Sequence, residues 1–237
     1  DSTVQTVGSS SNAGKMSPRN LLVTTITDEL KLATNFRSKV IGIALKDRGA
    51  ILPAGHLANA AYWFDDASGN MITSAYYMDE LPGWVQEFNA KKLPEKYLKQ
   101  DWKTLYGLNT YTQSLPDDNP YEGKFSGQET PVFPVKTSGM LEKGFGVLRR
   151  VPFGNSYTFD MAKAAVENEK LGQCVFTDFL ALSFSATDGV GHQFGINSIE
   201  VEDTYLRLDK DIASFFAFLD GKIGKGNYTV FLTADHG

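Results

Sequence analysis

Two Asp-His pairs are the residues in this 237-residue chain whose types and spacing are best suited to chemistry. Asp188 and His192 lie four positions apart among glycines, directly after an apolar run. Asp235 and His236 directly follow a second apolar run, residues 229–233. In open α/β sheets, ligands bind just outside the carboxyl ends of the strands. The sequence therefore predicts a site where two strands end.

A carboxylate oxygen together with an imidazole nitrogen suits zinc, with Mn²⁺ as the next candidate. The neighbouring glycines would let the chain turn sharply, so that the two side chains converge. For either pair alone, a structural reading is as good: Asp188 as a turn residue, and Asp235 with His236 as a helix cap. The occurrence of both pairs at expected strand ends favours the metal site.

The number of candidate ligands leaves the type of metal site open. Asp188, His192, Asp235 and His236 could fill one tetrahedral site or fill part of two. Two zinc ions about 4 Å apart, as used for phosphoryl transfer, would require roughly six or seven ligands. On the two-metal interpretation, this chain supplies only part of the ligand shell.

Lys46 and Arg48 follow another apolar run, residues 40–45. Two residues apart in an extended chain, they would project to the same side. Arginine presents a planar fork to phosphate oxygens and lysine a mobile point charge. By spacing alone, an ordinary solvated strand end is the more common explanation of such a pair. His56 has no acidic neighbour in sequence and is expected to be structural.

The elements that position these residues follow an α/β pattern. Ser17 and Pro18 predict the start of a helix that reaches about Asn35. Strand, helix and strand in this order imply a right-handed crossover and a parallel sheet. Other segments are expected as strands at 40–45, 178–184 and 229–233, a hairpin at 62–64 and 71–73, and helices at 158–171 and 202–219. Residues 84–150 have poor apolar periodicity and are expected to be an insertion, with helices near 84–89 and 94–101.

Composition narrows the class of partner. A net charge of −5 and a pI near 5.3 argue against nucleic acid or an anionic membrane as the main partner. Cys174 is the only cysteine, so an intrachain disulfide is excluded, and we expect it to be a small buried side chain. No apolar run reaches the roughly 18 residues that a membrane span requires.

Taken together, the motifs resemble a known family. Asp188-x-x-x-His192 within TDGVGHQFG, and Asp235-His236 within TADHG, resemble the metal motifs of the alkaline phosphatase superfamily, type I phosphodiesterase/nucleotide pyrophosphatase branch. Lys46-x-Arg48 within KDRGAILPAGH, with KMSPRNLL and EDTYLRLDKDI, is most similar to the bacterial zinc alkaline phosphatases of the PafA type.

The resemblance implies a fold and a set of roles. The fold would be an α/β core with a mostly parallel sheet flanked by helices and an inserted cap-like subdomain, divided into residues 1–83, 84–150 and 151–237. Asp188 and His192 would bind one zinc, and Asp235 and His236 the other. Lys46 and Arg48 would hold phosphoryl oxygens, as is typical of the monoesterases. The substrates would be small-molecule phosphate esters and the location periplasmic or secreted.

The resemblance also implies that part of the site lies elsewhere. In the family, a metal-binding Asp and a Thr or Ser nucleophile precede the region matched here, and a further metal-binding His follows it. We therefore expect a central fragment that is inactive and binds metal weakly by itself. Gly189 stands where a larger residue is expected in close relatives. The expected activity is zinc-dependent phosphate monoester hydrolysis through a phospho-threonine intermediate; a phosphodiesterase or nucleotide pyrophosphatase, or a non-catalytic binding module, is the alternative.

Overall fold

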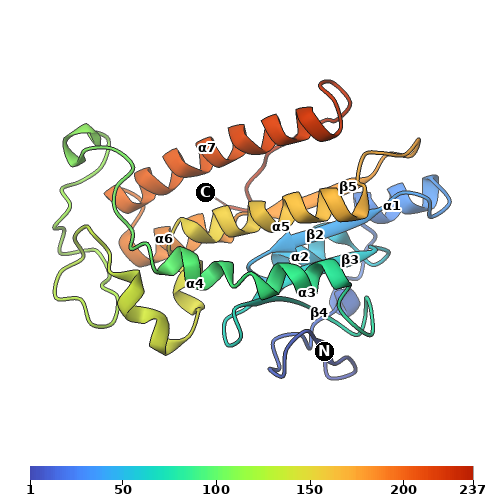
Figure 1. The fold of residues 1–237 in the computed structure, drawn as a ribbon, viewed down its shortest axis with the longest axis horizontal. Helices are drawn as coiled ribbons and strands as arrows, with labels where there is room; N and C mark the ends of the chain where they lie inside the picture. The colour runs from blue at the N-terminus through green and yellow to red at the C-terminus, as the bar shows by residue number, and fades with distance from the viewer. Residues whose placement is uncertain (237) are drawn as a thin grey trace.

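A five-stranded sheet lies at the centre of the computed structural model, which describes residues 1–236 (Figure 1). In the order β1-β4-β3-β2-β5, the strands are β1 (Thr6–Val7), β4 (Asn70–Ser74), β3 (Ala60–Asp65), β2 (Val40–Ala44) and β5 (Phe179–Ser183). One strand next to the edge, β2, is paired in parallel with both of its neighbours, β3 and β5, and the remaining pairs, β3 with β4 and β4 with β1, are antiparallel. The predicted α/β class is confirmed, and the sheet is mixed.

Helices cover both faces of this sheet. Helix α2 (Asp47–Ala54) packs against β2, β3 and β5 on one face. Helix α5 (Phe153–Glu169) packs on the opposite face, with the long last helix, α7 (Ile199–Lys222), beside it (Figure 1). The others are α1 (Ile26–Ala33), α3 (Gly83–Ala90), α4 (Leu93–Leu98) and α6 (Ser185–Phe194), with 3₁₀ turns η1 (Pro18–Asn20), η2 (Leu108–Thr110), η3 (Thr137–Lys143) and η4 (Gly146–Arg150).

Alternation along β2 divides its side chains between two apolar clusters. Ile41 and Ile43 belong to the larger cluster on the side of α5, whereas Ala44 packs in the smaller one with α2. This alternation is the period of two that a strand imposes. At Gly42, a Cβ would lie 2.1 Å from the carbonyl oxygen of Ala50, so glycine allows α2 to lie close against the strand.

The N-terminal helix begins later than predicted. Ser17 caps only the short turn η1, and Leu22 beyond it is 92% exposed. Helix α1 starts instead after Thr25, whose side chain accepts from the backbone N–H of Asp28 while the Asp28 carboxylate accepts from Thr25. This reciprocal capping box satisfies two backbone donors and fixes the start of the helix. Apolar spacing between residues 21 and 26 gave no such signal.

The predicted strand at residues 229–233 is absent. Val230, Phe231 and Leu232 are 51%, 67% and 80% exposed, and the segment has no strand pairing. The Phe231 ring lies 5.9 Å from the ring of Phe179 in β5, so the segment runs near the sheet edge without joining it. An apolar run becomes a buried strand only where ladder hydrogen bonds and cover on both faces are present, and the described residues supply neither here.

Residues 84–150 are not packed apart from the core. The Phe88 ring of α3 lies 5.5 Å from that of Tyr157 in α5, and Tyr97 of α4 donates to Asp160 at 2.7 Å. Both predicted helices in this stretch are present, and the hairpin of β3 and β4 is confirmed. The domain boundaries at 83/84 and 150/151 stay a prediction. Among the described residues, no helix has the length and apolar character needed to cross a membrane.

Candidate active site at the carboxyl ends of β2 and β5

The parallel pairing of β2 with β5 brings Lys46 and Asp188 together. Ala44 lies opposite Ser183 in this pairing, so the segments that follow leave the sheet at the same edge. Lys46 directly precedes α2, and Asp188 lies in the first turn of α6. The Lys46 Nζ donates to Asp188 Oδ2 as an ion pair between residues 142 positions apart in sequence. The sheet topology thus assembles this contact.

Two imidazoles approach the other oxygen of Asp188. His192 Nε2 lies 3.2 Å and His236 Nε2 lies 3.3 Å from Asp188 Oδ1. Asp188 and His192 are four residues apart within α6, a spacing that puts both on one helix face. The predicted sharp turn at the glycines is therefore wrong, because a helix makes the two side chains converge.

The groups around it hold the pKa of the Asp188 carboxyl below its usual value. The hydrogen bond from Lys46 is the largest cause, burial opposes it, and the charges of Lys46, His192 and His236 add to the lowering. Nearby positive charge favours the ionised carboxylate. Asp188 is thus held as an anion, which is the form that binds a metal ion.

Arg48 and Asp235 lie outside this group of contacts. Arg48 is in the first turn of α2, whereas Lys46 precedes the helix with an extended backbone. The two residues therefore do not lie in one extended segment, as the sequence predicted. The Arg48 side chain is 79% exposed, and its Nε lies 4.0 Å from Asp47 Oδ1. Asp235 is exposed, and none of the contacts around Asp188 involves it.

The donor set around Asp188 fits a zinc ion in chemical type. Two imidazoles lie within ion-pair distance of one carboxylate, and such ligands are common at zinc sites. Within residues 1–236, no group of three or more His, Cys, Asp or Glu side chains is arranged to hold a metal ion. The imidazoles face the carboxylate itself, and Lys46 takes its second oxygen. The side chains match zinc in chemical type, and in this structure Lys46 and both imidazoles each form an ion pair with Asp188.

Arg149, which sequence reasoning missed, fastens the strand ends beside this group. Its Nη1 donates to the carbonyl of Leu45 at 2.7 Å and its Nη2 to that of Phe64 at 2.8 Å. Its Nε donates to Asp66 Oδ1 at 2.6 Å. Leu45 immediately precedes Lys46, so the guanidinium fixes the chain where α2 begins. Two of its three partners are backbone carbonyls, which no sequence pattern marks.

Comparison with known proteins decides the family. The profile described as "Type I phosphodiesterase / nucleotide pyrophosphatase" matches residues 15–237. The chain belongs to the type I phosphodiesterase/nucleotide pyrophosphatase family. Over 237 residues it is 61% identical to "Alkaline phosphatase PhoV" of Synechococcus elongatus, covering 100% of this chain and 43% of that protein. A protein of Myroides odoratus named "Calcium-transporting ATPase" is 60% identical, covering 100% of this chain and 44% of that protein.

Solved structures of this family include "alkaline phosphatase PafA". Its wild-type crystal structure superposes with a TM-score of 0.94 at 53% identity, covering 96% of this chain and 44% of that one. The PafA of Elizabethkingia meningoseptica is 54% identical in sequence, covering 100% of this chain and 44% of that protein. A PafA variant structure, with a TM-score of 0.94 and 52% identity, has a threonine, an asparagine, a lysine and an arginine substituted, the last two positioned two residues apart. The chain thus spans less than half the length of the family members it matches.

In this family member, Gly189 lies where α6 meets the backbone of Arg149. A Cβ on Gly189 would lie 1.9 Å from the Arg149 carbonyl oxygen, so a larger side chain requires Arg149 to move. We expect Gly189→Ala to lower the free energy of unfolding by about 3 kcal/mol, measured by urea denaturation. Gly191→Ala in the same helix is the matched control, because nothing lies within 4 Å of its Cβ position. Equal stability of the two variants would refute this role for Gly189.

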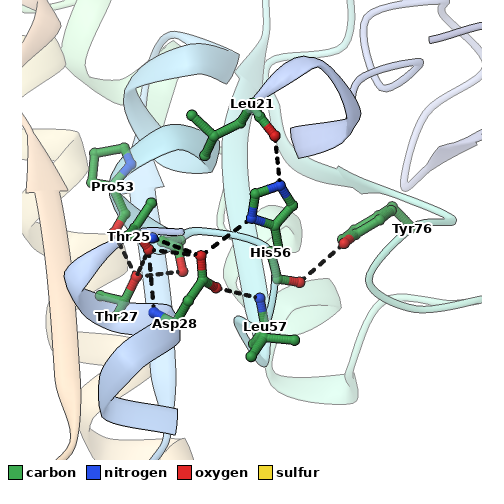
Figure 2. A network of polar contacts seen from close by, with 9 residues as sticks. Leu21, Thr25, Thr27, Asp28, Pro53, His56, Leu57 and Tyr76 are labelled. Carbon is green, nitrogen blue, oxygen red and sulfur yellow. Dashed lines mark hydrogen bonds and ion pairs between the residues drawn. The ribbon is translucent and has the colours of Figure 1, made fainter. Parts of the chain in front are cut away.

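His56 belongs to a separate buried network, shown in Figure 2. Its Nδ1 lies 3.2 Å from Asp28 Oδ2, and its Nε2 lies 2.9 Å from the carbonyl oxygen of Leu21. Asp28 is 1% exposed and also accepts from the backbone N–H of Leu57 at 2.8 Å. The network joins the start of α1 to the loop after α2, which supports the structural role predicted for His56.

Asp28→Asn is expected to destabilise the fold in a pH-dependent way. Burial alone would raise the pKa of Asp28, but hydrogen bonds from the backbones of Leu57 and Thr25 and from His56 outweigh it and lower the pKa below 3.8. The ionised carboxylate therefore contributes stability above pH 3.8, and this contribution is lost as the pH falls through the folded-state pKa. We expect a loss of about 3 kcal/mol at pH 7 that shrinks below pH 4, measured by urea denaturation.

The exposed Asp79 offers the matched control for this substitution. Asp79→Asn should change the free energy of unfolding by less than about 0.5 kcal/mol at either pH. A loss in Asp28→Asn that stays constant down to pH 3 would show that the carboxylate charge does not stabilise this network.

Cys174 is exposed, contrary to the prediction that it is buried. Its Sγ lies 3.3 Å from the carbonyl oxygen of Phe176, in the loop between α5 and β5. The loop turns outward between the helix and the strand, so the short side chain has no apolar cluster to enter.

Proposed function

We propose that the protein to which this chain belongs is a zinc-dependent phosphatase that hydrolyses phosphate monoesters. The observation that carries this proposal is the convergence of Lys46, His192 and His236 on the Asp188 carboxylate at one edge of the sheet. Such an edge is where ligands bind in α/β proteins. The relatives PhoV and PafA, both named alkaline phosphatases, support the same reaction, and small-molecule phosphate esters are the proposed substrates.

The two Asp-His pairs are proposed to serve two zinc ions. Asp188 and His192 would hold one ion, and Asp235 and His236 the other, each completed by ligands outside this chain. Bound zinc supplies Lewis acidity to the phosphoryl oxygens and lowers the pKa of a coordinated hydroxyl. The nucleophile is proposed to be a threonine outside this chain, which would carry the phosphoryl group as a covalent intermediate.

Lys46 and Arg48 are proposed to contact the non-bridging oxygens of the phosphoryl group. The Lys46 ammonium already faces the site through Asp188 and is a compact charge that can shift to a substrate oxygen. Arg48 lies in the first turn of α2, where helix N–H groups and the helix dipole favour an anion. The PafA variant in which a lysine and an arginine two positions apart are substituted has the spacing of this pair.

The runner-up is a phosphodiesterase or nucleotide pyrophosphatase on the same scaffold. The phosphoryl group of a monoester carries one more negative charge on its non-bridging oxygens than that of a diester. A Lys-Arg pair that contacts these oxygens therefore favours the monoester. We expect the full-length protein, loaded with zinc, to hydrolyse an aryl phosphate monoester with kcat/KM at least about 100-fold above that of its methyl diester. Faster diester hydrolysis would favour the runner-up. No zinc and no turnover would favour a non-catalytic binding module.

The location of the protein is a separate proposal. On the resemblance to bacterial phosphatases of the PafA type, we propose that it is periplasmic or secreted. Fractionation of cells that express the full-length gene would test this: recovery with the cytoplasmic marker enzymes would count against export.

A further inference from the structure

Glu122 and Glu200 are buried carboxyl groups for which the proposed phosphatase chemistry has no use. Glu200 is 0% exposed and Glu122 is 7% exposed. Among the described residues, no other residue donates a hydrogen bond to either Oε atom of these two side chains. Burying a carboxylate is costly unless it is paired, hydrogen-bonded or bound to a metal. Two such groups therefore require an explanation.

Backbone hydrogen bonds hold the segments that carry them side by side. The N–H of Leu115 donates to the carbonyl of Asn197 at 2.8 Å, and the N–H of Gly123 donates to that of Gln193 at 2.8 Å. Glu200 lies in the first turn of α7, three residues after Asn197. The loop that contains Glu122 is thus fastened along the connection between α6 and α7.

A cavity lies beside Glu122. Its volume is about 410 Å³, and its lining includes Asp118, Asn119 and Lys124. The Lys124 ammonium donates to the carbonyl of Glu129 at 2.6 Å, so it is directed to the backbone and not to the glutamate. The cavity offers oxygen atoms and room for water.

The electrostatics of the two glutamates favour a cation. Burial raises the pKa of Glu200 to about 8, the N–H of its own backbone opposes this, and the charges of Glu122, Asp117 and Asp203 raise it further. Burial likewise raises the pKa of Glu122 to about 7, helped by Asp117 and Asp118. A bound cation would reverse both effects, because an opposite charge favours the ionised carboxylate.

We propose that Glu122 and Glu200 bind a Ca²⁺ ion between the loop that contains Glu122 and helix α7. Ca²⁺ takes 6–8 oxygen ligands from carboxylates, amide or backbone carbonyls and water. Neither the two glutamates nor the residues that line the cavity include a histidine or cysteine, which disfavours zinc here. Two carboxylates neutralise the ion, and neutral oxygens and water complete the shell. This proposal is independent of the proposed phosphatase activity.

The test is a calcium titration of the 237-residue chain. After treatment with EDTA, we expect CaCl₂ at a hundredfold excess over Kd to raise Tm by about 5–10 °C, and to release protons at pH 7. MgCl₂ should give a smaller shift, because Mg²⁺ demands near-ideal octahedral geometry and gives up its water reluctantly. Absence of both a Tm shift and a heat of binding in calorimetry would overturn the proposal.

Four variants locate the ion. Glu122→Gln and Glu200→Gln should each weaken Ca²⁺ binding at least tenfold, judged against the same variant in EDTA so that any change in basal stability cancels. Glu202→Gln is the matched control on the same turn of α7, because its carboxylate already accepts from Ser114 at 2.6 Å. Asp188→Asn controls for binding at the phosphatase site. Full calcium stabilisation in both Glu122→Gln and Glu200→Gln would overturn the assignment.

The competing explanation makes an opposite prediction. If the two carboxyls simply keep their protons, the wild type gains nothing from calcium, and both Gln variants are more stable than the wild type at pH 8. This holds because a carboxyl whose pKa is raised by folding loses stability as the pH rises from the unfolded value through the folded one. That pair of results would overturn the proposal.

Discussion

Replacing Lys46 and Arg48 together by alanine is expected to lower kcat/KM for an aryl phosphate monoester by at least about 10³-fold in the full-length protein. Each side chain would stabilise charge that grows on the phosphoryl oxygens, and removal of one such donor typically costs 10²–10³ in rate. The losses should not add fully, because both groups act on the same phosphoryl unit. Steady-state kinetics of the zinc-loaded protein measures the effect.

Two comparisons make this result specific. The same double substitution should lower hydrolysis of the methyl diester much less, because the diester presents fewer charged oxygens to the pair. Lys99→Ala is a control for the loss of a lysine, since Lys99 pairs with Glu95 on the surface of α4. Equal losses on the monoester and the diester would remove the basis for a monoesterase.

Asp188→Asn should be at least as damaging. Asp188 is the group on which Lys46, His192 and His236 converge, and the amide keeps the shape while it removes the charge. We expect zinc content to fall by about one ion per chain and kcat to fall by at least about 10³-fold, because a metal contributes several kcal/mol of transition-state stabilisation. Elemental analysis and kinetics on the same sample measure both quantities.

A neighbouring carboxylate provides the control for Asp188. Asp47 lies in the first turn of α2, beside Lys46 and Arg48 in sequence, yet none of the contacts around Asp188 involves it. Asp47→Asn should therefore keep both zinc and most of the activity. Full zinc content and unchanged kcat in Asp188→Asn would exclude Asp188 as a ligand.

The sequence could predict that residues of the candidate site follow the ends of strands. Apolar runs marked β2, which is buried, and β5, which is a mostly half-buried edge strand; each is followed by charged residues, so Lys46 and Asp188 could be expected where these strands end. Their direct contact depends on β5 lying next to β2 in the sheet, which the order of elements along the chain does not specify. Topology decides which strand ends are neighbours.

Helix α6 shows where local signals mislead. Gly189 and Gly191 within it lower the intrinsic helix propensity and suggested a turn. Packing overrode that preference, because α6 lies so close to the Arg149 carbonyl that only glycine fits at position 189. The opposite error occurred at residues 229–233, where an apolar composition predicted a strand that the described surroundings do not pair or cover. In both places the outcome depends on contacts with residues far away in sequence, which are present at Gly189 and missing among the described residues around 229–233.

Anomalous diffraction at the zinc absorption edge, from crystals of the full-length protein, tests the proposed two-zinc site most directly. We predict two peaks, one within about 2.0–2.2 Å of ligand atoms of Asp188 and His192, and one at the same distance from those of Asp235 and His236. Asp235 is exposed in this structure. The second peak would also show whether its side chain turns toward the zinc ion when the other ligands of that ion are present. Crystals of active protein with no zinc peak beside these four side chains would contradict the proposal.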